Sequence, residues 1–295
     1  MLYLGIDGGG TKTEFCVADS SGQVISRTVL GPSNPVDIGI EETISVLKEG
    51  VFAVLPQKLQ QETSVFAGIA GVLGGSYKEM VTAFLKSFDF LKVRVGSDVE
   101  NAVAACLGRA DGVAVIMGTG TIAFAQKDGV HHRFGGFGYL FDEGGSGYAI
   151  GRDGILSALK SEEGSGAFTT LEQSLKETYA VDILWDAIPP IYKGGKREIA
   201  SFAPTVFAAA KKNDAVALSI LQKNMQAVAE NINHAVEIFP KQAVPVGLVG
   251  GITKQKDVIL PMIEKQVSPK AEVFVCEKTQ GQGALYLAGM EDEIC

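Results

Sequence analysis

The sequence predicts an α/β fold made of two similar domains, and three observations lead to this prediction. The 295 residues are enough for two domains of ordinary size. Strands and amphipathic helices alternate along most of the chain, as they do in α/β proteins. A unit of strand, glycine turn and strand opens the chain and recurs roughly 110 residues later, which is the pattern of a duplicated domain.

The composition is that of a folded, acidic protein. Apolar residues make up 46% and charged residues 20% of the chain, so we expect no long disordered tail. The formal net charge of -8 gives no general attraction to phosphate backbones or anionic membranes. We therefore expect neither nucleic acid nor a membrane as a partner.

The N-terminus and the cysteines favour a cytoplasmic protein. The opening residues MLYLGIDGGG lack the basic flank and long apolar core of a signal peptide. The four cysteines form no CxxC pair, which argues against a zinc site or a disulfide framework. The three histidines are too dispersed for a metal cluster. We expect reduced thiols in the core, apart from Cys295 at the tail.

The first domain is expected at residues 1–112. Leu2, Leu4 and Ile6 alternate as in a strand, and the glycines after them form a turn. Strands over 11–18 and 23–30 complete an antiparallel meander. The remaining elements follow from hydrophobic periodicity: a helix over 40–54, a strand over 64–69, a helix over 77–88, a strand over 93–95 and a helix that ends before Gly108.

The second domain is expected at residues 113–281, and a final helix at 282–295 is expected to complete the first domain. Strands over 113–117 and 121–126, each followed by a turn, and a strand from 130 repeat the opening pattern. The chain then becomes mainly helical, with a break at Pro204 and a long helix capped by Asp214. Strands over 246–249 and 271–275 flank a helix that starts near Thr253.

The two glycine turns indicate phosphate binding. Backbone N–H groups in such turns approach a phosphate closely because no side chain stands in the way. The segment from Asp7 to Thr13 fits this need, and Asp7 stands where it could hold Mg²⁺ through water. The turn Gly118 to Thr121 offers the same donors. Neither turn is a Walker loop, and the first is no GxGxxG helix opening because β-forming residues follow it.

The segment LGIDGGGTKTEFCVAD, followed by GSDVENA, MGTGT, GGFG and LVGG, resembles the BadF/BadG/BcrA/BcrD-type ATPase family and, within it, the N-acetylglucosamine kinases. The match covers nearly the whole chain in the order of the family. It implies two ribonuclease H-like domains of the actin and hexokinase type with an ATP cleft between them. It also implies an ATP-dependent sugar kinase that uses Mg²⁺.

The resemblance assigns nucleotide contacts to three glycine segments. Asp7 would be the Mg²⁺ ligand, acting through water. Gly281 to Ala284 either contact the nucleotide or cap the last helix. The residues implied to bind ATP are Gly8, Gly9, Gly10, Thr11, Lys12, Thr13, Gly118, Thr119, Gly120, Thr121, Gly250 and Gly251.

Asp98 aligns with the catalytic aspartate of the family and would contact the sugar. Its carboxylate would accept the proton of a sugar hydroxyl as the oxygen attacks the γ-phosphorus. Without the resemblance, Asp98 reads as the N-cap of a helix that starts at Val99. Glu100 is expected on the surface of the same helix.

The resemblance also implies sugar-binding residues. Asn34 matches a substrate-contacting asparagine, although by itself it reads as a turn residue. Gly136 and Phe137 match a loop over the acyl-amino group. A gapless alignment places Glu143 on the sugar-binding aspartate of the family, whereas a shift by one residue places Asp142 there, and both alternatives stay open.

N-acetylglucosamine, phosphorylated at the C6 hydroxyl, is the first expected substrate, with glucosamine and N-acetylmuramic acid as alternatives. The sequence offers weaker support for two other classes of function. An activator ATPase of a radical dehydratase needs a cysteine before an alanine- and glycine-rich turn, which no cysteine here has. A non-catalytic nucleotide-binding regulator usually carries large insertions or an added domain. A homodimer is compatible with the sequence, but no residue specifies one.

Overall fold

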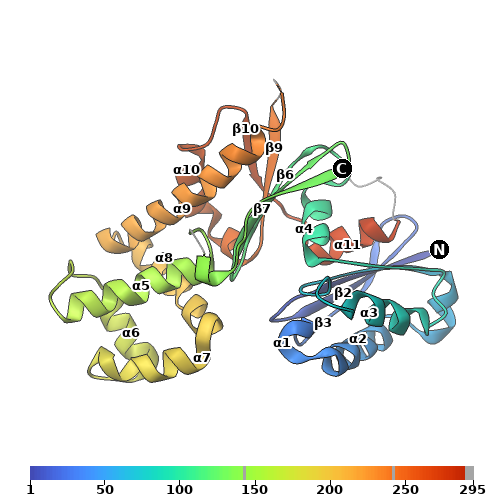
Figure 1. The fold of residues 1–295 in the computed structure, drawn as a ribbon, viewed down its shortest axis with the longest axis horizontal. Coiled ribbons are helices and arrows are strands. Elements are labelled where there is room, and N and C mark those ends of the chain that lie inside the picture. Colours follow the sequence, from blue (N-terminus) through green and yellow to red (C-terminus); the bar gives the residue numbers. More distant parts are fainter. Residues whose placement is uncertain (142–143, 241–242, 290–295) are drawn as a thin grey trace. The chain divides into compact units, whose positions relative to one another are not determined.

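The computed structural model describes residues 1–141, 144–240 and 243–289, which form two compact units (Figure 1). The first unit contains Met1–Arg109 and the described residues from Cys276 onward, and the second contains Ala110–Val275. Each unit is built on one five-stranded sheet with helices against it. The predicted α/β class is therefore confirmed. Among the described residues, no helix has the length and apolar character needed to cross a membrane.

The sheet of the first unit has the order β3-β2-β1-β4-β5. The pairs β1–β2 and β2–β3 are antiparallel, and the pairs β1–β4 and β4–β5 are parallel. The opening meander predicted from alternation is thus present. The strands are β1 (Leu2–Gly8), β2 (Thr13–Asp19), β3 (Val24–Leu30), β4 (Thr63–Ile69) and β5 (Lys92–Gly96).

Helices cover both faces of this sheet (Figure 1). On one face, the side chains of Leu4, Ile6 and Phe15 form a core with apolar residues of α2 and α3. On the other face, α11 lies against β1, β4 and α4, and Leu285 packs with Cys16. The helices are α1 (Pro35–Ile38), α2 (Ile40–Val54), α3 (Tyr77–Lys86), α4 (Asp98–Leu107) and α11 (Gln280–Ala288), with a 3-10 turn η1 (Gln57–Glu62).

The sheet of the second unit repeats the topology of the first. Its order is β10-β9-β6-β7-β8, with β6–β7 and β7–β8 antiparallel and β6–β9 and β9–β10 parallel. The same order and directions in both sheets confirm the internal repeat predicted from the glycine turns. The strands are β6 (Gly112–Met117), β7 (Thr121–Lys127), β8 (Val130–Gly135), β9 (Val244–Val249) and β10 (Ala271–Val275).

The second unit carries a larger set of helices. The long helix α9 begins after Asp214, whose side chain accepts hydrogen bonds from the N–H groups of Val216 and Ala217, as predicted. Pro204 lies in the first turn of α8, so the predicted break falls between α7 and α8. The helices are α5 (Gly147–Glu162), α6 (Leu171–Tyr179), α7 (Ile188–Ser201), α8 (Ala203–Lys211), α9 (Ala215–Val236) and α10 (Lys256–Glu264), with 3-10 turns η2 (Tyr139–Phe141), η3 (Leu184–Ala187) and η4 (Gly251–Gln255).

Candidate active site

The candidate site in the first unit lies where three parallel strands end. The register of β1, β4 and β5 pairs Gly8 with Ile69 and Gly68 with Gly96, so their carboxyl ends share one edge of the sheet. In α/β proteins this edge is the usual place for ligands. The segments that leave the edge are the predicted phosphate turn, the loop after β4 and the start of α4 with Asp98.

The turn between β1 and β2 is tightly held and open to solvent. The N–H of Gly9 donates to the carbonyl oxygen of Lys12 at 2.9 Å, and the N–H of Ser33 donates to that of Gly9 at 3.0 Å. A Cβ atom at Gly8 would lie 2.4 Å from the Ser33 Oγ atom, so no larger residue fits there. At the tip, Gly9 and Gly10 are partly exposed and Thr11 and Lys12 are exposed.

The Thr13 hydroxyl group is not available to a ligand at this tip. Its side chain is fully buried. The hydroxyl donates to the carbonyl oxygen of Gly31 at 2.8 Å and is hydrogen-bonded to the Ser33 hydroxyl, also at 2.8 Å. The structure therefore gives the Thr13 side chain a role in tying the turn to the chain after β3, and only the Thr11 hydroxyl is exposed beside the glycines.

Asp7 is a buried carboxyl held by Asn101, a residue to which the sequence analysis gave no role. The Asn101 amide nitrogen lies 2.8 Å from Asp7 Oδ1, 3.2 Å from the Ile6 carbonyl oxygen and 3.0 Å from that of Gly68. Burial raises the pKa of Asp7 from 3.8 to about 7; the Asn101 hydrogen bond lowers it, and the nearby charge of Asp98 raises it. A polar residue inside the Ala- and Val-rich helix after Asp98 was the signal that could have revealed Asn101.

Asp98 is the first residue of α4, and its side chain is partly buried. The preceding Ser97 is the N-cap, so the predicted cap at Asp98 and the helix start at Val99 are both corrected by one residue. Burial raises the pKa of the Asp98 carboxyl, whereas hydrogen bonds with the backbone N–H groups of Val99 and Asp98 itself lower it. Asp7 and Asp98 both lie at the carboxyl-end edge of the sheet, near the ends of β1 and β5.

Glu100 has a structural partner and is not a free surface residue. Its Oε1 atom accepts a hydrogen bond from the N–H of Ser97 at 2.9 Å, which completes a capping box. The side chain folds back over Gly96, where a Cβ atom would lie 2.3 Å from Oε1. Glu100 therefore fixes the start of the helix that carries Asp98.

Asn34 caps a short helix at the same edge of the sheet. Its Oδ1 atom accepts a hydrogen bond from the N–H of Val36 at 3.0 Å, and its amide donates to Asp37 Oδ2 at 3.0 Å. A Cβ atom at Gly71, in the loop after β4, would lie 2.2 Å from Oδ1. Asn34 is therefore a turn residue, as its sequence context predicts. Its partly exposed amide lies beside the carboxyl end of β4.

The second unit brings its two predicted nucleotide segments to one edge of its own sheet. β6 and β9 are parallel, and Ile116 pairs with Val249, so the turn Gly118 to Gly120 and the pair Gly250 and Gly251 leave the sheet side by side. Thr119 and Gly120 are exposed at the tip. Gly250 has φ 116°, and a Cβ atom there would lie 2.5 Å from the Met117 carbonyl oxygen, so only glycine fits. Gly251 has open space around it.

The start of α5 supports the glycine turn of the second unit. The N–H groups of Gly147 and Tyr148 donate to the carbonyl oxygens of Gly118 and Thr119 at 2.8 and 3.2 Å. These carbonyl groups are turned toward α5. The Thr121 hydroxyl is buried and has no hydrogen-bond partner within the described part of the chain.

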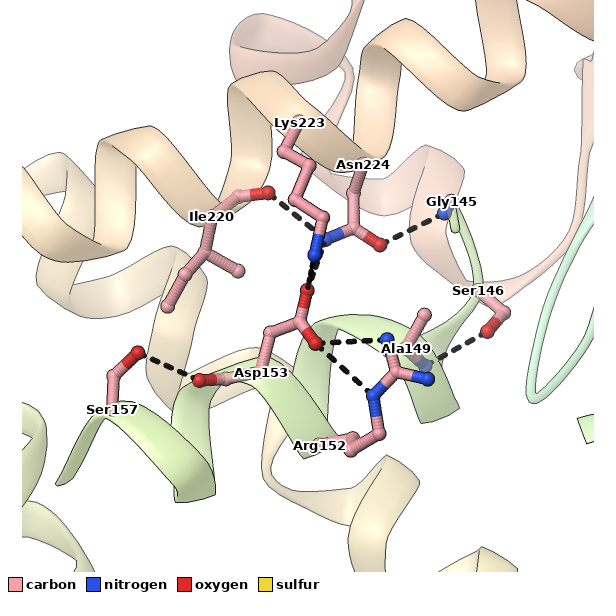
Figure 2. A network of polar contacts seen from close by, with 9 residues as sticks. All are labelled: Gly145, Ser146, Ala149, Arg152, Asp153, Ser157, Ile220, Lys223 and Asn224. Atoms are coloured by element: carbon pink, nitrogen blue, oxygen red, sulfur yellow. Dashed lines mark hydrogen bonds and ion pairs between the residues drawn. The ribbon is translucent and has the colours of Figure 1, made fainter. Parts of the chain in front are cut away.

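Figure 2 shows the network that fixes the chain just before α5. The N–H of Gly145 donates to Asn224 Oδ1 at 2.9 Å, and Ser146 caps α5 by accepting from the N–H of Ala149. Asp153 forms ion pairs with Arg152 at 2.9 Å and with Lys223 of α9 at 3.1 Å. The network joins α5 to α9 and thereby holds the helix end on which the glycine turn rests.

The residues predicted to contact the sugar in the second unit are only partly described. Gly136 follows β8 with φ 69°, and its carbonyl oxygen accepts a hydrogen bond from Arg133. Phe137 is 67% exposed, so its ring is open to a ligand and covers no core residue. Asp142 and Glu143, the two alternatives for the sugar-binding carboxylate, lie outside the described residues.

The donor set around Asp7 suits a magnesium ion that is carried mainly by a nucleotide. Within residues 1–141, 144–240 and 243–289, no group of three or more His, Cys, Asp or Glu side chains could hold a metal by itself. Beside the Asp7 carboxyl, the Asn101 Oδ1 atom is buried without a hydrogen-bond partner among the described residues. Carboxylate and amide oxygens are ligands that Mg²⁺ accepts, directly or through water.

The chain is similar to known proteins over nearly its whole length. The family model described as the BadF/BadG/BcrA/BcrD ATPase family matches residues 4–285. An N-acetylmuramic acid/N-acetylglucosamine kinase of Clostridium acetobutylicum is 30% identical, over 98% of each chain. An N-acetyl-D-glucosamine kinase of Dictyostelium discoideum is 27% identical, over 97% of this chain and 98% of that one. A crystal structure of a Chromobacterium violaceum protein has a TM-score of 0.78 at 23% identity, over 97% of this chain and 98% of that one, and supports the fold.

Proposed function

Because this chain belongs to the BadF/BadG/BcrA/BcrD ATPase family, we propose that it transfers a phosphate group from ATP to the hydroxyl of a sugar. The substrate that we favour is N-acetylglucosamine, phosphorylated at its C6 hydroxyl. Two relatives that span the chain carry this sugar in their names. N-acetylmuramic acid and glucosamine are the alternatives, and a cytoplasmic location follows as a proposal from the use of ATP.

The observation that carries the proposal is the pair of carboxyls at one edge of the first sheet. Asp98 stands at the start of α4 and accepts the proton of the sugar hydroxyl. Burial raises the pKa of Asp98, which makes its carboxylate a stronger base. The capping box of Ser97 and Glu100 fixes the backbone at Asp98, so the carboxylate is positioned before the sugar arrives.

Asp7 and Asn101 would hold the magnesium ion, which neutralises charge on the phosphates when it is bound. Without a cation, burial raises the pKa of Asp7 to about 7, so near neutral pH the carboxyl is partly protonated. The Asp7 carboxyl would therefore release this proton if Mg-ATP bound beside it. Asn101 orients the carboxylate through its hydrogen bond to Oδ1 at 2.8 Å.

The glycine turns supply phosphate donors. In the first unit the tip carries the exposed Thr11 and Lys12, and the Lys12 ammonium adds positive charge. In the second unit Gly120 is exposed, and a Cβ atom added to it would have no other atom within 4 Å. A phosphate oxygen can therefore approach the backbone of either turn.

Replacement of Asp98 by Asn tests the catalytic role. We expect Asp98→Asn to bind ATP normally and to lose about 10² to 10⁴ in kcat, since general base catalysis contributes that much. The matched control is Glu100→Gln on the same helix, because glutamine preserves the capping box while it removes one carboxylate. Turnover of Asp98→Asn near the wild-type rate, measured by a coupled ADP assay, would overturn the assignment.

A substrate panel tests the sugar. The coupled assay is run with N-acetylglucosamine, N-acetylmuramic acid, glucosamine and glucose at equal concentrations. The highest kcat/KM for N-acetylglucosamine supports our choice, and the product is identified by NMR as the 6-phosphate. A higher kcat/KM for glucosamine or N-acetylmuramic acid replaces it with that sugar. Hydrolysis of ATP that no sugar stimulates would contradict the kinase proposal itself.

A further inference from the structure

Two cysteines from distant parts of the sequence meet in the first unit. Cys106 lies in the last turn of α4, and Cys276 follows the last residue of β10. The two thiols lie close enough for each to shift the pKa of the other. The Cys276 thiol also donates to the carbonyl oxygen of Ala105 at 3.3 Å, which holds its sulfur against the end of α4. Both thiols are free and partly exposed.

Both cysteines lie near the points in the sequence at which the chain passes between the two units. The chain leaves the first unit after Arg109 and returns to it at Cys276. Cys106 lies in α4, three residues before Arg109. A covalent link between the two sulfur atoms would therefore join the end of α4 to the residue at which the chain re-enters the first unit.

The two thiols differ in reactivity. The proximity of Cys106 lowers the pKa of the Cys276 thiol. The proximity of Cys276 and burial together raise the pKa of Cys106. This direction favours Cys276 as the thiol that reacts first, with Cys106 as its partner.

Cys16 provides an internal comparison. It is 1% exposed, its thiol donates to Glu14 Oε1 at 3.2 Å, and burial together with the Glu14 charge raises its pKa to about 12. A thiol in that setting does not react while the unit is folded. A reagent that is selective for accessible thiolates should therefore separate Cys276 from Cys16.

We propose that Cys106 and Cys276 form a redox-active pair that a hydroperoxide converts into a reversible intramolecular disulfide. The Cys276 sulfur attacks the terminal peroxide oxygen, the O–O bond breaks, and a sulfenic acid forms while the peroxide leaves as an alcohol, or as water from hydrogen peroxide. The Cys106 sulfur then attacks the Cys276 sulfur, the S–O bond breaks, and the second oxygen leaves as water. The two thiol protons end in these two products.

The disulfide would act on the same helix that carries the proposed catalytic residues. α4 has Asp98 and Asn101 at its start and Cys106 at its end. A bond to Cys276 would restrain the end of α4, so the oxidised protein is expected to turn over more slowly. This second step rests on the proposed kinase function, whereas formation of the disulfide does not.

The test follows the thiols and the activity separately, on the full chain. Cys295, which lies outside the described residues, is replaced by serine in every protein. After hydrogen peroxide treatment the protein should lose about 2 Da, and alkylation should be blocked at Cys106 and Cys276 but not at Cys16 after denaturation. In the variant Cys106→Ser, Cys276 should gain about 16 Da as a sulfenic acid that dimedone traps. In Cys276→Ser neither change should occur.

The outcomes separate the two steps. A Cys106–Cys276 disulfide that dithiothreitol reverses confirms the pair, whatever the kinase activity. Failure to form it, with Cys276 alkylated no faster than Cys16 in the folded protein, overturns the proposal. If the disulfide forms, regulation is supported when kcat falls several-fold on oxidation and dithiothreitol restores it. Cys106→Ser should show no such loss of kcat. An unchanged kcat in the fully oxidised protein refutes the regulatory step, and melting curves of both serine variants exclude misfolding as the cause.

Discussion

Replacement of Asp7 by Asn probes the buried carboxyl on which the magnesium proposal depends. The folded protein keeps the Asp7 proton up to about pH 7, whereas the unfolded chain releases it near 3.8. The free energy of unfolding must therefore fall as the pH rises through this window, and Asp7 adds no further change above it. The full difference between the two pKa values corresponds to about 4 kcal/mol.

Between pH 5 and pH 8 the Asp7 carboxyl should account for a loss of about 2 to 3 kcal/mol in the free energy of unfolding. Asparagine carries no charge at either pH, and its Oδ1 atom can still accept the bond from Asn101. Asp7→Asn should therefore gain about 2 to 3 kcal/mol relative to the wild type when the pH is raised from 5 to 8. The matched control is Asp89→Asn, an exposed residue with φ 56°, a conformation that asparagine also tolerates.

The assay must report on the first unit. The single tryptophan, Trp185, belongs to the second unit, so its fluorescence follows the wrong part of the chain. Urea titrations without magnesium, read by pulsed hydrogen exchange of the peptide that contains β2, measure the first unit directly. If the wild type and Asp7→Asn lose stability in parallel between pH 5 and 8, the carboxyl is not desolvated and our account of Asp7 is wrong.

Three further changes test the remaining contacts. Asn101→Ala should lower the free energy of unfolding of the first unit by about 2 to 4 kcal/mol, because it removes a buried amide with three acceptors. It should also weaken Mg-ATP binding. The control Asn233→Ala breaks a similar bond in the second unit and should lower stability without changing the magnesium dependence. Gly8→Ala should cost about 1 to 3 kcal/mol through its clash with the Ser33 Oγ atom. Gly120→Ala should leave the melting temperature unchanged but raise the KM for ATP about tenfold, and an unaltered KM would refute phosphate binding at that turn.

The fold followed well from the sequence because local signals agreed with the tertiary structure. The Asp214 cap, the break at Pro204 and the two strand-turn-strand units were each predicted by chemistry that acts within a few residues. The start of α4 was misplaced because Ser97 and Asp98 are both good N-cap residues. Glu100, three residues after Ser97, decides which of the two is the N-cap, because it forms the capping box with Ser97.

The site was harder to predict because the contacts of its side chains depend on how distant segments pack together. Thr13 was expected among the phosphate donors, yet strand alternation places it on the same face as Phe15 and Val17, which are core residues. Asn101 received no role because its partners, Asp7 and the Gly68 carbonyl group, are far away in sequence. Pairings of this kind become visible only when the strands are placed side by side.

The last described helix has a consequence for how the protein is made. α11 lies against β1, and a Cβ atom at Gly5 would lie 2.6 Å from the Leu285 nitrogen, so this part of the strand is shaped for close contact with α11. During synthesis the opening strands leave the ribosome long before α11 does. Until then the surface around Gly5 and Cys16, which α11 covers in the folded unit, stays exposed in the unfinished chain.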